Sequence, residues 1–380
     1  MIKNWQCLAM LSLLVALVAC TPKQAAVALA PTPQLASPTP ELPTAPSLSR
    51  EDVAWSHIVE AAKKEGKVTA YGDTFTGEIR QAVADAFFEK YGIRAEMITG
   101  PGSVLTERIR TEQRMKEAVA DVALISPASV VLLLQEGRLV PLAKELPVLR
   151  EDAWLVPLLM DDGGHLLRSY ASFQSPWINT DIVKPEEAPK SWADLLNPRW
   201  RGKLLINDPR TTAVADRNVY TLTKYKIVEP DFFPKLAAQK LAIPAGVGMG
   251  PPYLALAKGE GAILIFGVDS SGAPIAKEGG HIKPTVFTGG VTGISSAFQL
   301  IKNAPHPNAG KLFINFLLSQ QGYELVTTIG QKGSFRKDVP DRSVMASLRP
   351  FNVMTNTIED EIQINKNVRD GVAAKALGVQ

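Results

Sequence analysis

The spacing of hydrophobic positions changes along the chain and predicts its elements. After residue 50, short apolar runs alternate with longer stretches in which apolar residues recur every three to four positions. The short runs predict buried strands, and the longer stretches predict amphipathic helices. The expected order begins with a helix over 51–65, a strand over 68–71 and a helix with Ile79, Val83 and Phe87 on one stripe.

The same alternation continues and predicts an α/β fold. Further strands are expected at 93–98 and 121–125, each followed by a helix. Strand, loop and helix in repetition indicate right-handed crossovers and a mainly parallel sheet.

A segment that interrupts the regular strand–helix alternation predicts a second lobe. Its expected strands lie at 170–179, 203–206 and 262–266, and the strand–helix alternation returns from about residue 283. One insertion between two halves of a parallel domain predicts two lobes joined by more than one crossing. We therefore assign residues 51–170 and 286–380, with the C-terminal helices, to lobe one, and residues 171–285 to lobe two.

The N-terminal residues predict export and anchoring. A single cation, Lys3, precedes an apolar run over 8–18, which is too short to cross a membrane. The run exits through the sequence LVAC at 17–20, which resembles the lipobox of bacterial lipoproteins. We predict a signal peptide over 1–19, a lipidated Cys20, and a proline-rich tether over 20–50 that holds the protein at the outer face of the cytoplasmic membrane. The alternative is an ordinary signal peptide with an incidental cysteine.

Composition narrows the chemistry. The chain has 2 cysteines, Cys7 and Cys20, so no thiol remains in the folded part for a disulfide, a zinc site or a nucleophile. The formal net charge of +3 comes without a basic run, which argues against a nucleic-acid partner. The four histidines, at 57, 165, 281 and 306, match no metal spacing. We expect a monomer without cofactor or bound metal, and no enzyme.

Several motifs resemble those of family 1 extracellular solute-binding proteins, in particular the iron(III)-type branch with the type 2 periplasmic binding fold. They are FEKYGI at 88–93, ADV at 120–122, WINTD at 177–181, PKSWADLLNPRWRGK at 189–203 and PHPNA at 305–309. Their order and spacing make the set specific. The resemblance implies two α/β lobes with a ligand cleft between them, and a permease partner in an ABC importer. Trp192 and Leu195 are expected to be core anchors, since apolar stripes on helices usually pack inward.

Ligand sites in parallel sheets lie beyond the carboxyl ends of the strands, and the loops there carry hydroxyl residues. Segment 208–212 (DPRTT) also resembles the family's "dP" loop, whose small hydroxyl residues face the cleft. Backbone N–H groups at helix starts together with hydroxyls suit an anion. For each Ser or Thr, a role as the N-cap of a helix explains its position as well as a ligand-binding role does. The predicted ligand-binding residues are Thr74, Ser103, Ser126 and Ser129 from lobe one and Arg210, Thr211, Ser270 and Ser271 from lobe two.

The chain departs from the iron(III)-binding branch at one position that matters. Those members place two adjacent tyrosines after the strand that corresponds to 262–266, whereas this chain has GVDSSG at 267–272. We therefore favour capture of a small, anionic solute by lobe closure. Iron(III) or an iron complex is the alternative ligand. A lipid-anchored sensor or enzyme on the same fold is the alternative function.

Overall fold

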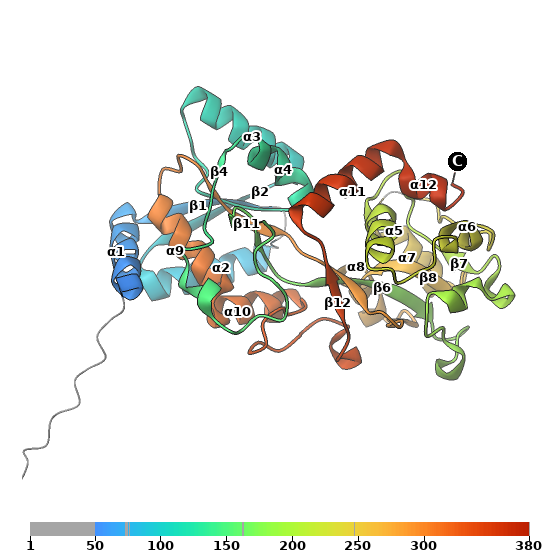
Figure 1. The fold of residues 1–380 in the computed structure, drawn as a ribbon. Helices are drawn as coiled ribbons and strands as arrows, with labels where there is room; N and C mark the ends of the chain where they lie inside the picture. Colours follow the sequence, from blue (N-terminus) through green and yellow to red (C-terminus); the bar gives the residue numbers. More distant parts are fainter. Residues whose placement is uncertain (1–49, 73–74, 76, 162, 247, 380) are drawn as a thin grey trace, which may run out of the picture. The chain divides into compact units, whose positions relative to one another are not determined.

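The computed structural model describes residues 50–72, 75, 77–161, 163–246 and 248–379. The predicted signal peptide, the lipidated Cys20 and nearly all of the predicted tether lie outside these residues. The described residues belong to one compact unit, Leu48–Gln380, which contains two six-stranded sheets (Figure 1). The expected two-lobed α/β fold is confirmed.

The first sheet has the strand order β2-β1-β3-β11-β4, and β5 also pairs with β11. Its side chains alternate between two cores. Val68 and Leu124 pack against α2 (Gly77–Tyr91) and α9 (Pro307–Leu318). Tyr71 and Ala123 pack on the opposite face with α3 (Gly102–Met115) and α4 (Pro127–Gln135). This alternation follows from the two-residue period of a strand. The strands are β1 (Lys67–Gly72), β2 (Arg94–Thr99), β3 (Val122–Ile125), β4 (Leu139–Val140), β5 (Leu167–Arg168) and β11 (Ala297–Ile301).

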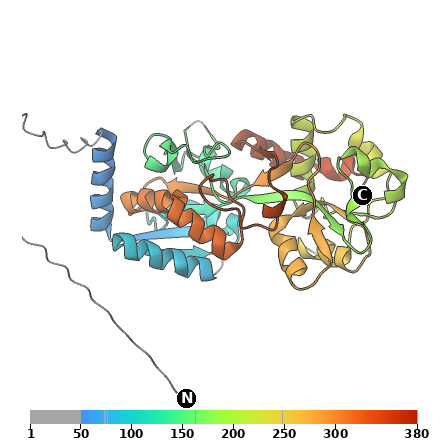
Figure 2. The same cartoon turned by 90° about the horizontal axis from the view of Figure 1, so that it is seen from below.

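Helices cover both faces of this sheet (Figures 1 and 2). The predicted stripe of Ile79, Val83 and Phe87 on α2 is buried, as expected. Helix α9 begins at Pro307, a residue that fits the first turn because its missing N–H would have no intrahelical partner there. The helices are α1 (Arg50–Glu65), α2 (Gly77–Tyr91), α3 (Gly102–Met115), α4 (Pro127–Gln135), α9 (Pro307–Leu318) and α10 (Gln320–Gly330).

The second sheet has the order β12-β10-β6-β8-β7, with β9 on β6. Trp192 and Leu195 are buried in one of its cores, as predicted. The strands are β6 (Ser172–Asn179), β7 (Leu204–Leu205), β8 (Ile263–Val268), β9 (Ile282–Pro284), β10 (Val291–Ile294) and β12 (Val353–Thr355). The helices are α5 (Val214–Lys224), α6 (Phe232–Ala237), α7 (Gly250–Ala257), α8 (Asp269–Lys277), α11 (Ile358–Asp370) and α12 (Val372–Ala376), and 3₁₀ turns lie at Pro147–Arg150, Pro185–Glu187, Ala193–Leu196, Pro198–Trp200 and Ala346–Leu348.

The expectation of mainly parallel sheets needs correction, because both sheets are mixed. In the first sheet, β11 runs antiparallel to β3, β4 and β5. In the second, β6 runs antiparallel to β8, β9 and β10. The physical reason is that β6 and β11 each follow a link of only two or three residues from the other sheet. They therefore enter without the helical crossover that makes neighbouring strands parallel.

Short links join the two sheets. Residues 169–171 lead from β5 into β6, and residues 295–296 lead from β10 into β11. The chain was expected to cross between the lobes more than once, and these two links show that it does. The predicted limits of the lobes remain a prediction, although β10 and β12, which that prediction placed in lobe one, pair within the second sheet.

Candidate functional site

A pocket of about 250 Å³ lies where elements of both sheets end. Ser126 follows β3 of the first sheet, and Ser270 follows β8 of the second. The two links between the sheets form much of the remaining wall, together with residues of the adjoining strands, the first residue of α4, and one residue each from α5 and from the segment after α10. The lining residues are Ser126, Pro127, Ser169, Tyr170, Ala171, Ser172, Arg217, Val268, Ser270, Ile294, Ser295, Ser296 and Lys332.

Serine hydroxyls dominate the polar lining. Ser126 Oγ donates to Ser129 Oγ at 3.2 Å, and the hydroxyls of Ser172 and Ser270 lie 3.3 Å apart. The hydroxyl of Ser295 is buried and has no hydrogen-bond partner among the described residues. A buried polar atom without a partner costs free energy, so this hydroxyl is a natural contact for a polar ligand.

Two helices start at the pocket. Ser126 is the N-cap of α4, and α8 begins at Asp269, next to Ser270. The first N–H groups of a helix have no intrahelical acceptor and carry the positive end of the helix dipole. These starts bring partial positive charge to the pocket from both sheets.

A buried carboxylate orders two of the serines. Asp269 is 3% exposed and accepts hydrogen bonds from the Ser172 hydroxyl and, at 2.7 Å, from the Ser270 backbone N–H. Burial raises the pKa of Asp269 to about 6, and the hydrogen bond from Ser172 opposes the rise. Because Ser172 donates to Asp269, its oxygen keeps lone pairs that can accept a hydrogen bond from a ligand.

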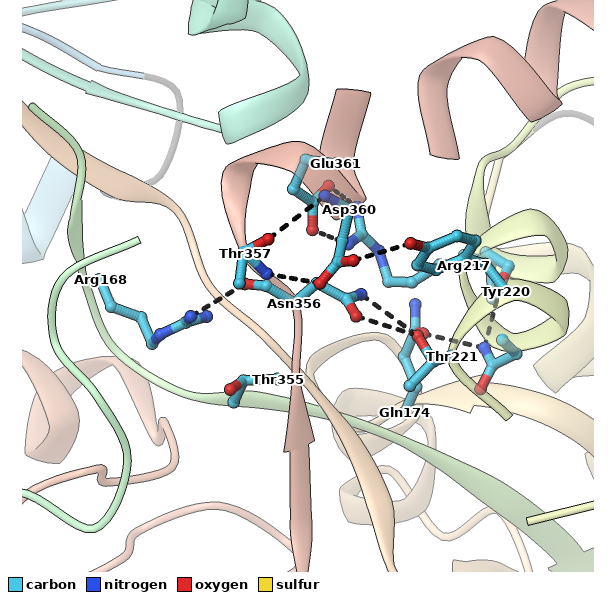
Figure 3. Close-up of polar contacts among 12 residues, drawn as sticks. Arg168, Gln174, Arg217, Tyr220, Thr221, Thr355, Asn356, Thr357, Asp360 and Glu361 are labelled. Atoms are coloured by element: carbon cyan, nitrogen blue, oxygen red, sulfur yellow. Dashed lines mark hydrogen bonds and ion pairs between the residues drawn. The ribbon is translucent and has the colours of Figure 1, made fainter. Parts of the chain in front are cut away.

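Two cationic side chains complete the lining. The ammonium of Lys332 is half-buried, and its pKa is lowered by burial, with Asp269 acting in the opposite direction. No carboxylate of the described residues lies within 4.0 Å of this ammonium. Arg217, on α5, forms a two-pronged ion pair with Glu361 of α11, in which Nη2 lies 2.7 Å from Oε2 (Figure 3).

The structure brings some of the predicted ligand-binding residues together. Ser126 and Ser270 line the pocket, and Ser129 contacts Ser126 behind it. Ser271 follows Ser270 on α8 but is not part of the lining. Thr74 lies outside the described residues. The ligand contacts themselves remain predictions.

Three other predicted residues lie away from this pocket. Ser103 is exposed inside the first turn of α3 and is not its N-cap residue, since that position belongs to Pro101. Arg210 is exposed, and its guanidinium binds Asp208, with both Nε–Oδ1 and Nη2–Oδ2 at 2.9 Å. Thr211 donates to the backbone oxygen of Asp208. The turn at Asp208 thus uses these side chains locally.

Sequence reasoning missed most of the lining. Ser169, Ser172, Ser295 and Ser296 belong to the links between the sheets or flank them, and Lys332 follows α10. No motif marks any of them. The single available signal was the double serine at 295–296, which directly precedes an apolar strand.

The side chains that usually bind metal ions are dispersed over the described part of the chain. Within the described ranges, no group of three or more His, Cys, Asp or Glu side chains is placed to hold a metal ion. The tyrosine in the pocket lining, Tyr170, donates its hydroxyl to the backbone oxygen of Leu317 at 3.1 Å. Its ring is buried among Phe75, Phe298 and Tyr323.

Comparison with known proteins establishes the family. The profile of the family described as "Bacterial extracellular solute-binding protein" matches residues 68–330. The chain belongs to this family. It is a solute-binding protein of the type that serves ABC importers. Among the residues that the structure describes, no helix is long and apolar enough to span a bilayer.

A relative in Salmonella typhimurium bears the name "Putative 2-aminoethylphosphonate-binding periplasmic protein". It is 25% identical over 270 residues, which are 68% of this chain and 74% of that protein. The protein of the same name in Salmonella typhi has the same identity and coverage.

Solved structures share the fold. The Trichodesmium protein IdiA (FutA), in complex with iron and citrate, has a TM-score of 0.70 at 18% identity, over 83% of this chain and 100% of that one. The periplasmic binding protein AfuA of Actinobacillus pleuropneumoniae, with fructose-6-phosphate bound, has a TM-score of 0.56 at 20% identity, over 82% of this chain and 97% of that one. At these identities the likeness shows the two-lobed fold alone.

Proposed function

We propose that this protein is a lipid-anchored binding protein that captures a small organic anion in the serine-lined pocket and delivers it to an ABC permease. The anion would be a phosphonate, a phosphate ester or a carboxylate. The observation that carries the proposal is the pocket itself, in which serine hydroxyls, two helix starts and Lys332 converge from both sheets.

The chemistry of the lining favours an oxyanion. Hydroxyl groups and helix N-termini donate hydrogen bonds to anionic oxygens, and a lysine ammonium adds a charge-assisted contact. Among the described residues, the pocket lining contains no cysteine and no histidine. The name of the Salmonella relatives supports the phosphonate class as a first candidate.

Lobe closure is the proposed mode of capture. The pocket wall comes from both sheets and from the two links between them, so a ligand bound there would contact both lobes at once. Hinge motion through such links is a common way to enclose a ligand. Small-angle scattering is expected to show compaction at saturating ligand, and an unchanged curve would contradict closure.

Calorimetry with a panel of ligands tests the proposal. The panel contains inorganic phosphate, 2-aminoethylphosphonate, acetate, iron(III) citrate and free iron(III), and native mass spectrometry checks for retained solute. We expect binding of at least one anion without iron. Tight binding of free iron(III) with a visible absorption band, and no response to any anion, would overturn the proposal.

Two serine variants locate the site. Ser295→Ala removes a buried hydroxyl that has no partner among the described residues, so we expect the melting temperature to hold or rise and the affinity for the bound anion to fall. A hydrogen bond to a charged group contributes about 1.5–3 kcal/mol, which corresponds to a loss of about 10- to 150-fold. Ser103→Ala is the matched control, because Ser103 is exposed and outside the pocket lining. Loss of binding in the control alone would move the site to the loops predicted from the sequence.

A further inference from the structure

Arg217 reaches the pocket as half of an ion pair. Its side chain is 14% exposed, and that of its partner Glu361 is 5% exposed. Arg217 comes from α5, which packs beside the second sheet, whereas Glu361 comes from α11, much later in the chain. Both terminal nitrogens of the guanidinium contact carboxylate oxygens of Glu361, so the geometry is the planar two-pronged one that arginine and carboxylate favour.

Helix α11 holds Glu361 in this place. Its first turn is a capping box in which the Thr357 hydroxyl accepts from the Asp360 backbone N–H, while the Asp360 carboxylate accepts from the Thr357 N–H at 2.8 Å. Asp360 also accepts from the Tyr220 hydroxyl at 2.7 Å (Figure 3). It pairs with Lys224 as well. Tyr220 and Lys224 of α5 therefore both bind Asp360, the residue that precedes Glu361 in α11.

The pair changes the charge balance of the pocket. Among the lining residues, Arg217 and Lys332 are cationic. Glu361 neutralises the first directly, and Asp269 lies close enough to the second to raise its pKa. Arg168 is a further buried cation, next to the lining residue Ser169, and the Glu361 carboxylate partly offsets the lowering of its pKa by burial. By pairing with Arg217, Glu361 therefore reduces the positive charge that the pocket would otherwise present to a ligand. A buried charge that is not compensated is costly, so the Glu361 carboxylate makes the pocket less favourable for a ligand with two negative charges and no positive one than the pocket would be without it.

We infer that Glu361 sets the charge class of the ligand: by occupying Arg217, it makes the pocket favour an anion that carries its own ammonium group over an anion of the same size that does not. This inference rests on the proposed function, because it concerns the same pocket. Glu361 is a positioning residue, which acts on the ligand through Arg217.

The test compares two ligands that differ in one group. 2-Aminoethylphosphonate and propylphosphonate have the same length, and an ammonium in the first replaces a methyl group in the second. We expect the wild-type protein to bind 2-aminoethylphosphonate more tightly by calorimetry. Glu361→Gln removes the negative charge and releases Arg217, so we expect the preference to shift toward propylphosphonate. The shift should be at least about tenfold, which is the interaction of two unit charges about 12 Å apart at an effective dielectric constant near 20.

Matched variants exclude a trivial cause. Glu359→Gln makes the same substitution on the same helix at an exposed position, so it should leave the ratio of the two affinities unchanged. Glu361→Asp keeps the charge and should keep the preference. The wild-type comparison needs no variant, which keeps the inference testable if Glu361→Gln does not fold.

The outcomes separate the inference from the proposed function. Binding of neither phosphonate nor any other anion by the wild-type protein would refute the proposed function. Binding of both phosphonates with equal affinity, or an unchanged ratio in folded Glu361→Gln, would refute the inference and leave the anion pocket standing. An equal shift in Glu359→Gln would also refute it, because the effect would then be a general one of helix charge.

Discussion

Replacing Lys332 by methionine should separate ligand binding from stability. The ammonium lines the pocket and has no carboxylate within ion-pair distance among the described residues. A contact between this ammonium and a bound anion would be a charge-assisted hydrogen bond, worth about 1.5–3 kcal/mol. We therefore expect Lys332→Met to weaken binding of the anion by about 10- to 150-fold.

The stability of the ligand-free protein should change in the opposite direction. Burial lowers the pKa of Lys332, which means that the folded state disfavours its charge relative to the unfolded state. This cost is present at neutral pH and disappears only above the unfolded pKa of 10.5. Methionine has a similar length and no charge, so the melting temperature of Lys332→Met should equal or exceed that of the wild type.

The assay pairs isothermal titration calorimetry with differential scanning calorimetry, both at pH 7.5. Lys283→Met is the control, because it removes the same charge from an exposed position on β9 outside the pocket. Unchanged affinity in Lys332→Met would refute the assignment of this pocket. A parallel loss of stability and binding would refute the electrostatic reasoning, since the variant would then act through misfolding.

Three further predictions concern stability and location. The pKa of Asp269 is about 6 in the folded protein, against 3.8 for an ordinary aspartate. Its ionised form therefore destabilises the fold above pH 6, and this free-energy cost fades as the pH falls toward 4. The unfolding free energy of the wild type relative to Asp269→Asn should accordingly rise by about 1 kcal/mol between pH 7 and pH 5, as measured by denaturant titration; a flat difference would contradict the raised pKa. Gly267→Ala would place a methyl group 2.3 Å from Cδ1 of Trp177 and should lower the free energy of unfolding by about 1–3 kcal/mol, as measured by thermal unfolding. Gly250→Ala, whose methyl group meets open space, should leave the stability unchanged. Equal melting temperatures of the two variants would contradict the predicted clash. Cys20→Ser should abolish lipid labelling and release the protein from membranes, and a variant that still sediments with membranes would refute the anchor.

The elements themselves were accessible from the sequence because they depend on local patterns. The stripe of Ile79, Val83 and Phe87 predicted α2, and the buried run after Ala262 predicted β8. A proline at the first position of α9, Pro307, is likewise a local feature that fits a helix start. Periodicity and capping act within a few residues, so the chain reveals them without a three-dimensional structure.

Strand direction and the contents of the pocket depended on tertiary structure. Links of two or three residues reverse the direction of β6 and β11, and no local signal in those links distinguishes them from ordinary loops. Ser126 and Ser270 could be predicted because they follow strands, where ligand sites of α/β sheets lie. Lys332 and the ion pair between Arg217 and Glu361 could not, because hydrogen bonds and charge pairs between residues far apart in the chain exist only once the sheets and α11 have packed.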